Sequence, residues 1–311
     1  MSEKGTCSTK KCLFCGRVLS PKRIRGGGKS DEHVVPQWLL RHLAIGAEAI
    51  APTHLDVRTG AVVHARRHRM GNLVVGSVCQ GCNNGWLSGL ENQAEPLLKD
   101  LIADPHRLST LKKAERRLVA RWVFKTAAAL NRSSTYGNAE ISPSHPVSDR
   151  HLQALREGNI PDEVAVLGGG CACNRSFDFF QTDNWSAPED GFPLQPEDQH
   201  LSYKIGLSFR DLLFAVAFFP NAEYHYAVAH RVYYPLWGGA RGIVPWRAQM
   251  DQSPLLSNSP AIEGFVRSVG VVSRTYCQLR VNHAETQLVV PVGQTNVPSV
   301  QLEVAFFDGP D

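Results

Sequence analysis

The chain has 311 residues, of which 43% are apolar, so it can build a sizeable core and about two domains. It contains no apolar run long enough to span a bilayer. The net charge is +4, but residues 1–132 hold 22 basic and 10 acidic side chains, whereas the remainder holds 11 and 19. A basic first half favours a polyphosphate partner, although an ordinary solvated surface would give the same counts.

Two CxxC pairs stand out: Cys12 with Cys15, and Cys79 with Cys82. A spacing of two residues lets both sulfurs of a pair turn onto one ion at tetrahedral angles. The chain has eight cysteines and its first residues lack a secretory signal, which indicates reduced thiols and metal binding rather than disulfides. We therefore expect one structural Zn²⁺ and a cytoplasmic location.

The segment behind the first pair begins with a basic, glycine-rich stretch, residues 22–29. It is either a plain surface connection or a loop that grips phosphate. Residues 30–35 should form a first strand, and residues 36–43 a short helix that begins at Pro36, because proline suits a first helical position. The basic residues of the stretch are Lys22, Arg23, Arg25 and Lys29.

Residues 45–71 read as a long insertion, and residues 72–78 as the second strand of a hairpin. The insertion holds a dense basic run with Arg66, Arg67 and Arg69. This run is either a solvated loop or a contact to a nucleic-acid backbone, which would add affinity without sequence specificity.

Three helices should follow, at about residues 85–103, 110–131 and 148–157. Pro96 is expected to kink or divide the first of them. The second is expected to serve in packing, with Leu118, Trp122 and Lys125 near one another on its surface.

Beyond residue 159, short apolar runs alternate with Gly, Pro, Asn and Asp, which is typical of a largely antiparallel β domain. We expect strands at residues 164–167, 177–181, 203–207, 212–219, 224–232, 266–272, 287–292 and 300–307. The predicted organisation is a first domain at 1–132, a helical connection at 133–159 and a β-rich domain of unknown role at 160–311. The fold class is α+β.

The residues around the cysteine pairs carry a family resemblance. Between the pairs lies Asp31-Glu32-His33-Val34-Val35-Pro36, and directly behind the second pair lies Asn83-Asn84-Gly85-Trp86. Residues 12–92 resemble the zinc-containing HNH endonucleases, with their pattern CxxC…EH(V/I)(V/I)P…N-apolar…CxxCN. The resemblance implies a ββα-metal, treble-clef-like fold in which a hairpin and a helix surround a divalent ion and zinc staples the base.

His33 matches the general base of that family. A histidine titrates near neutrality and can accept a proton at working pH. By resemblance, the acid before it binds the catalytic Mg²⁺ or Mn²⁺; this is Glu32, with Asp31 in reserve. Neighbouring side chains of an ideal strand point to opposite faces, so a twist or bulge would be needed for both to serve one site.

Three asparagines are further candidates. Asn83 matches the last member of the motif and would bind the divalent ion through its oxygen, unless it only caps a helix. The adjacent Asn84 is an alternative ligand. Asn72 matches the middle asparagine, which supports the catalytic histidine, but it lies 11 positions before Asn83 where the family pattern has about nine. Glu91, eight residues after Asn83, either assists the metal or is solvated, and we favour the solvated interpretation.

The leading hypothesis is a metal-dependent HNH endonuclease that hydrolyses DNA, with RNA as a possible substrate and a homodimer as a possible assembly. One alternative is a zinc-stapled nucleic-acid-binding module without turnover. Another is an effector nuclease, for instance in defence against phage, whose C-terminal domain senses a regulatory ligand or protein. Sequence specificity and the number of strands cut remain open.

Overall fold

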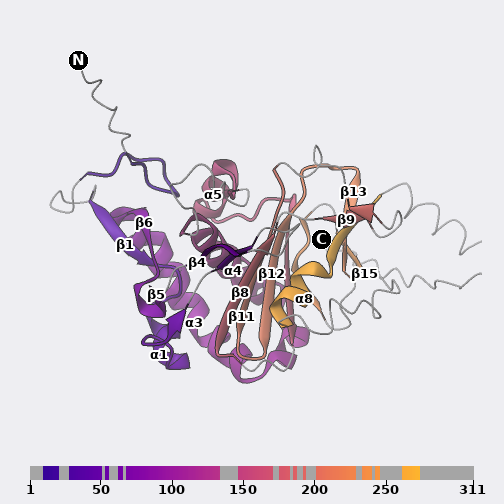
Figure 1. Ribbon diagram of the computed structural model, residues 1–311, viewed down its shortest axis with the longest axis horizontal. Helices are drawn as coiled ribbons and strands as arrows, with labels where there is room; N and C mark the ends of the chain where they lie inside the picture. The colour runs from indigo at the N-terminus through magenta and orange to yellow at the C-terminus, as the bar shows by residue number, and fades with distance from the viewer. Residues whose placement is uncertain are drawn as a thin grey trace, which may run out of the picture. The chain divides into compact units, whose positions relative to one another are not determined.

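The computed structural model describes residues 10–20, 28–50, 53–55, 62–65, 68–133, 146–170, 175–182, 185–187, 192–193, 201–228, 233–239, 242–245 and 261–273. This part of the chain combines helices and sheets in an α+β fold (Figure 1). It divides into two compact units, one of Met1–Ala103 with Leu111–Pro161, the other of Asp104–Thr110 with Asp162–Asp311. Within the described part, no helix combines the length and apolarity that a bilayer span requires.

The frame of the first unit is an antiparallel pair, β1 (Lys29–His33) with β6 (Val74–Cys79). Both predicted hairpin strands are thereby confirmed, with ends shifted along the chain. β1 stops before Val34 and Val35, where the chain bends ahead of Pro36. The insertion forms two small antiparallel pairs, β2 (Ala49–Ile50) with β5 (His68–Arg69) and β3 (Thr53–Leu55) with β4 (Val62–Ala65).

Short helices flank this frame. Helix α1 (Gln37–Leu43) begins one residue after Pro36 and ends at Ala44, which adopts the left-handed conformation. The 3₁₀ helix η1 (Met70–Asn72) precedes β6. The second cysteine pair leads into α2 (Gln80–Cys82), the π-helical turn η2 (Asn83–Leu87) and α3 (Ser88–Ala103).

A division of the helix at Pro96 is wrong, because α3 runs through this residue, whereas a kink there stays a prediction. Pro96 is exposed, and so is Asn92 four positions earlier, whose carbonyl loses its helical partner. Water can satisfy that carbonyl, which makes an interior proline tolerable. The irregularity lies instead at Gly85, with φ −97° and ψ −110°.

Helix α4 (Lys113–Ser133) is the central helix of the first unit and packs on α3, α5 and β6. From Trp122 to Asn131 every residue is buried, so this half has no solvent face. Helix α5 (Asp149–Arg156) starts where predicted, and Ser148 caps it by accepting a bond from the His151 N–H.

The second unit is built on a five-stranded antiparallel sheet in the order β14-β7-β12-β11-β8. Its strands are β7 (Val164–Gly170), β8 (Phe177–Thr182), β11 (Tyr203–Phe209), β12 (Leu212–Phe218) and β14 (Tyr234–Trp237). A three-stranded sheet holds β15 (Ile243–Pro245), β13 (Tyr224–Val228) and β16 (Val269–Ser273), and a small pair joins β9 (Ser186–Ala187) with β10 (Phe192–Pro193). The 3₁₀ helix η3 (Pro105–Thr110) packs Leu108 against Gly168 of β7.

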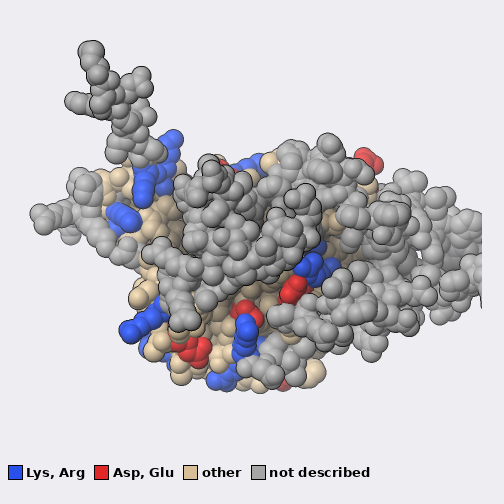
Figure 2. Space-filling view, viewed as in Figure 1, with Lys and Arg blue, Asp and Glu red and all other residues tan. Residues whose placement is uncertain are grey.

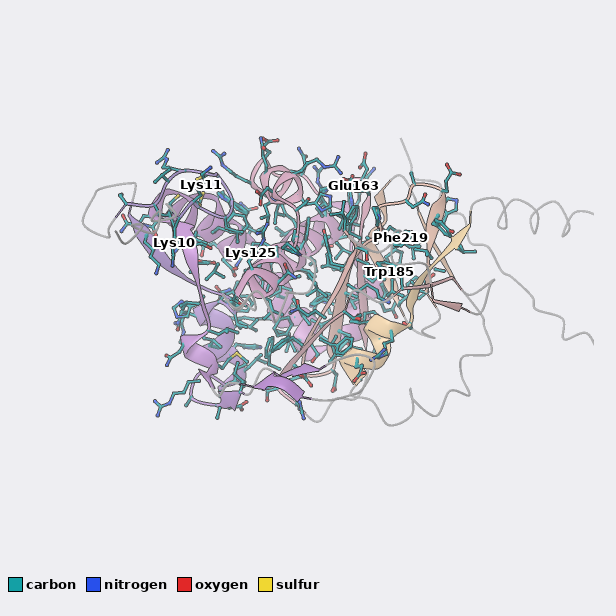
Figure 3. All side chains as sticks on the ribbon, turned by 45° about the horizontal axis from the view of Figure 1, so that its top comes forward. Lys10, Lys11, Lys125, Glu163, Trp185 and Phe219 are labelled. Carbon is teal, nitrogen blue, oxygen red and sulfur yellow. The ribbon has the colours of Figure 1, made fainter. Side chains whose placement is uncertain are left out.

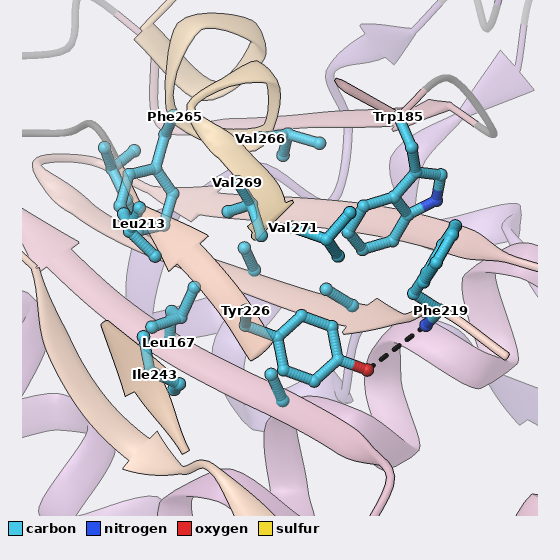
Figure 4. Close-up of a cluster of buried hydrophobic side chains, with 14 of the residues drawn as sticks. Leu167, Trp185, Leu213, Phe219, Tyr226, Ile243, Phe265, Val266, Val269 and Val271 are labelled. Carbon is cyan, nitrogen blue, oxygen red and sulfur yellow. Dashed lines mark hydrogen bonds between the residues drawn. The ribbon is translucent and has the colours of Figure 1, made fainter. Parts of the chain in front are cut away.

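Helix α8 (Ala261–Arg267) covers β11, β8 and β12 and closes the core of this unit (Figure 4). In that core the Tyr226 hydroxyl accepts a bond from the Phe219 N–H at 3.1 Å and donates one to the Glu163 carbonyl. The predicted strand at 266–272 is partly wrong: its first residues end α8, and only the rest is strand. The strands predicted at 287–292 and 300–307 lie outside the described residues.

Candidate metal centre and active site

A β-bulge shapes the frame that carries the EHVVP motif. Ser30 pairs with Val78 and Glu32 with Val75, so Asp31 faces two residues, Gly76 and Ser77. The extra residue lies on β6, and β1 keeps its regular alternation. The bulge therefore does not bring Glu32 and His33 to one face of β1, as sharing one site would require.

The bulge also joins the first cysteine pair to the frame. Leu13 N–H donates to the Ser77 carbonyl at 2.7 Å, and Cys12 N–H to the Arg17 carbonyl at 2.7 Å. A bridge between Lys11 and Val18 closes this N-terminal turn. The first CxxC pair is thus held beside the end of β6, where the second pair begins.

The four predicted cysteines lie together, and their sulfurs are within 4.8 Å of one another. Sγ of Cys15 and Sγ of Cys79 are 3.7 Å apart. Four sulfurs bound to one zinc ion at about 2.3 Å lie about 3.8 Å from each other, so a modest contraction would complete the tetrahedron. The cluster can hold a metal ion such as zinc, with residues Cys12, Cys15, Cys79 and Cys82.

Backbone amides point at these sulfurs. Cys79 N–H donates to Sγ of Cys12, and Cys82 N–H donates to Sγ of Cys79, both at 3.4 Å. A hydrogen bond from the Cys82 thiol, together with backbone amides, lowers the pKa of Cys12 to about 4 against the effect of burial. The same hydrogen bond and burial raise the pKa of Cys82. Such donors favour thiolates, the form that binds zinc.

His33 stands at the end of β1, half-buried, and contacts the helix that follows. Its Nε2 is 2.5 Å from Nε2 of Gln37. An amide nitrogen can only donate, so Nε2 of His33 accepts and the neutral ring carries its proton on Nδ1. Gln37 is exposed and can turn away, which would leave Nε2 to accept a proton from water.

Glu32 is buried and faces α4. Its Oε1 lies 3.3 Å from Nζ of Lys125, whose side chain has no exposed surface. The same Nζ lies 2.5 Å from Oε1 of Glu91. Burial alone would lower the pKa of Lys125, but the charges of Glu91 and Glu32 outweigh it, so the pKa is raised and the amine stays protonated. The side chain of Asp31, the reserve candidate, lies outside the described residues.

Asn83 faces β1, because its Nδ2 donates to Oγ of Ser30. Ser30 and Glu32 are two positions apart and lie on the same face of β1. The bond to Ser30 uses the amide nitrogen and leaves the amide oxygen for a cation. The interpretation of Asn83 as a helix N-cap is wrong: its backbone is already helical where α2 ends, and its side-chain Nδ2 donates to Ser30.

The other two asparagines are exposed. Asn84 makes no side-chain bond among the described residues. Asn72 ends η1, two positions from Val74, which is the partner of His33 on β6. Alternation along β6 would direct it to the side of His33, although η1 interrupts that strand geometry.

The predicted nucleic-acid contacts are described only in part. Arg69 is exposed and Lys29 half-buried, whereas Lys22, Arg23, Arg25, Arg66 and Arg67 lie outside the described residues. Three further exposed basic residues, Lys10, Lys11 and Arg17, belong to the N-terminal turn that carries the first cysteine pair. Figure 3 labels Lys10 and Lys11, and Figure 2 colours the basic side chains of one face blue.

The interpretation of Glu91 as a solvated residue is wrong. Its Oε2 accepts bonds from the indole N–H groups of Trp38 at 2.8 Å and Trp122 at 2.9 Å, and its Oε1 pairs with Lys125. Sequence reasoning missed this cluster. One signal was available: Lys125 interrupts an apolar run on a long helix, and a lysine in such a place is rarely buried unless it is paired.

Searches against protein families, curated proteins and solved structures return no match. The site is therefore interpreted from its own chemistry and from the motif alone.

Proposed function

We propose that this chain is a metal-dependent endonuclease of the HNH type that hydrolyses phosphodiester bonds of DNA. One observation carries the proposal. The strand with Glu32 and His33 pairs with the strand that ends in the second cysteine pair, and Asn83 just behind that pair contacts the first strand. The EHVVP motif and the CxxCN motif thus meet in a strand-strand-helix unit beside a four-cysteine cluster.

In this proposal His33 is the general base. Its Nε2 takes a proton from the attacking water after the Gln37 amide has moved aside, and the protonated ring later releases that proton to solvent. The neutral form with the proton on Nδ1 is the one that the Gln37 contact selects.

Glu32 and Asn83 would hold the divalent ion through a carboxylate oxygen and an amide oxygen, the donors that Mg²⁺ and Mn²⁺ prefer. When bound, such an ion supplies charge stabilisation for the leaving 3′ oxygen. Both residues lie on the face of β1 that Ser30 shares. His33 is the last residue of β1 and is still paired with Val74, so it starts from the opposite face. The proposal therefore requires its ring to turn around the end of the strand toward the ion.

The four-cysteine site has a different role in this proposal. Four thiolates leave no open position on a tetrahedral zinc ion, so the ion would be structural. It would fix the N-terminal turn and the start of η2 on the end of β6, and with them Asn83.

Lys29, Arg69 and the basic residues of the N-terminal turn would contact the DNA backbone. Phosphate contacts of this kind give affinity and salt dependence but no sequence preference. RNA has the same phosphates, and both substrates are worth testing.

The proposal is tested with supercoiled plasmid. The zinc-loaded protein should nick it with Mg²⁺ or Mn²⁺ and stop when EDTA is added, whereas His33→Ala should be inactive with an unchanged fold. A zinc-loaded, folded wild type that leaves plasmid intact with every divalent ion would refute the proposal.

One observation favours a second candidate, a nucleic-acid-binding module without turnover. Glu32 already has a cation beside it, the ammonium of Lys125, and a carboxylate so balanced has less need of a metal. This candidate predicts a shift of DNA in a gel but no divalent binding at Glu32. Binding of Mn²⁺ that depends on Glu32 would exclude it.

A further inference from the structure

A buried cluster in the first unit contains more acidic than basic groups. One ammonium, on Lys125, lies between two carboxylates, those of Glu32 and Glu91. Figure 3 labels Lys125. The cluster keeps a net negative charge in a place that water barely reaches. Buried charge of this kind is costly unless it has a purpose or a further counter-ion.

The two carboxylates hold Lys125 differently. Nζ is 2.5 Å from Oε1 of Glu91 but 3.3 Å from Oε1 of Glu32. Glu91 has more partners than Glu32, because its other oxygen accepts bonds from the indoles of Trp38 and Trp122, while its Oε1 meets Lys125 as an ion pair only. Glu91 is therefore the better-held of the two carboxylates and anchors the ammonium.

Glu32 is held on one side only. Among the described residues, Lys125 is its one side-chain partner, and the contact uses one oxygen. The side chain of Glu32 is 11% exposed, whereas that of Lys125 is 0% exposed. Oε1 thus faces the interior, and β1 places Glu32 on the same face as Ser30, the residue that Asn83 contacts.

We propose that Lys125 is a positioning residue for the divalent-ion centre: anchored by Glu91, it holds Oε1 of Glu32 so that the other oxygen of Glu32 is presented, beside Asn83, to the ion. This proposal rests on the function proposed above. Outer partners that orient a metal-binding carboxylate typically change metal affinity tenfold to a hundredfold when they are removed. Lys125 comes from α4, far from the motif in sequence, and would complete a site that the motif alone leaves unfinished.

Binding of Mn²⁺, followed through the electron paramagnetic resonance signal of the free ion, tests the proposal without reference to activity. The full-length, zinc-loaded wild type should bind Mn²⁺, and Glu32→Gln should lose that binding. Lys125→Met should bind Mn²⁺ at least about tenfold more weakly. Lys99→Met is the matched control, because it removes a lysine that pairs with Glu95 on the surface of α3, and it should bind as the wild type does.

Zinc content and tryptophan fluorescence report whether each variant is folded. Lys125→Met leaves two buried carboxylates together, so the double variant Lys125→Met/Glu91→Gln provides a less charged background. Its glutamine oxygen can still accept the two indole bonds, and Glu32 still lacks the contact from Lys125. Weakened Mn²⁺ binding in either folded variant supports the proposal, and wild-type or tighter binding in a folded variant overturns it.

Cleavage adds a second readout. If Lys125 only positions Glu32, Lys125→Met should need more Mg²⁺ for half-maximal nicking yet keep most of its rate at saturating Mg²⁺. If the wild type binds Mn²⁺ in a way that depends on Glu32 and Lys125 but never cuts DNA, the proposed function is wrong and the inference about Lys125 still stands. If the wild type cuts DNA but Lys125→Met has unchanged Mn²⁺ affinity, the inference about Lys125 is wrong and the proposed function still stands.

Discussion

Nζ of Lys125 lies 2.5 Å from Oε1 of Glu91, in a position where the lysine has no exposed surface. The pair joins α4 to α3 in the interior of the first unit. Two indole N–H groups converge on the second oxygen of the same glutamate. Removing one partner of a buried pair is costly, because the remaining charge stays buried without compensation.

Replacement of Glu91 should therefore destabilise the first unit severely. Glu91→Ala leaves the ammonium of Lys125 with Glu32 alone and strands two indole donors, each of which costs about 1–3 kcal/mol when unpaired, so we expect a loss of about 2–6 kcal/mol in the free energy of unfolding. Urea denaturation followed by tryptophan fluorescence measures it.

Glu95→Ala is the control for that experiment. Glu95 lies one turn further along α3 and pairs with Lys99 at the surface, so its loss should cost less than about 1 kcal/mol. If the two substitutions lowered the free energy of unfolding equally, the buried cluster would stabilise the first unit no more than a surface ion pair does.

The candidate site was only partly predictable from the sequence. The cysteine cluster could be predicted because two CxxC pairs are recognisable from their spacing along the chain. The partnership of Glu32 with Lys125 joins residues 93 positions apart, and only the packing of α4 against β6 brings them together. Glu91 was interpreted as solvated because a glutamate on an amphipathic helix is usually exposed. No local sequence pattern shows that the indole N–H groups of Trp38 and Trp122 donate to its carboxylate.

Loss of one cysteine of the cluster should release the metal. Cys82→Ser replaces a buried sulfur by a hydroxyl that zinc binds poorly, so we expect loss of zinc and a lower unfolding temperature. Elemental analysis and a thermal melt measure both effects.

Cys7→Ser is suited as its control, because Cys7 stands outside both CxxC pairs. This variant should retain a full complement of zinc. A Cys82→Ser protein that keeps one tightly bound zinc per chain would argue against the four-thiolate site.

The two adjacent asparagines should differ in their effects. Asn83 is joined to Ser30 on the face of Glu32, whereas Asn84 is exposed. Asn83→Ala should slow plasmid nicking by about a hundredfold, the order of effect of losing one group that stabilises the reacting charge. Asn84→Ala should nick at nearly the wild-type rate, and the opposite ranking would assign the ion to Asn84.

The packing of helix α8 against strand β11 in the second unit can be tested at Gly206. A Cβ at Gly206 of β11 would collide with Val266 and lie 2.8 Å from Ile262, both on α8. Gly206→Ala should therefore cost about 1–3 kcal/mol through overpacking. Thermal unfolding of the purified variant measures it.

Gly264→Ala provides the comparison on α8 itself, since a Cβ there meets nothing within 4 Å. It should be neutral or stabilise by up to about 1 kcal/mol, because alanine is the better helix former. If Gly206→Ala were equally harmless, α8 would not pack on β11 as closely as described.

The strands of the second unit were easier to predict than its helix. Long alternations of apolar runs and turns marked β7, β8, β11, β12 and β13. The apolar run at 266–272 was predicted to be one strand because a short apolar stretch does not distinguish the end of a helix from a buried strand. β14 was missed because Pro235 argues against a strand; the sheet tolerates it since β14 lies at the edge.

The most direct test of the central claim compares His33→Ala with wild type in single-turnover nicking of supercoiled plasmid at saturating Mg²⁺. His42→Ala, an exposed histidine on the neighbouring helix α1, serves as the matched control. We predict that wild type and His42→Ala nick at similar rates, and that His33→Ala is slower by about a hundredfold or more with unchanged zinc content. Nicking by His33→Ala at the wild-type rate, or none by a folded wild type, would contradict the account.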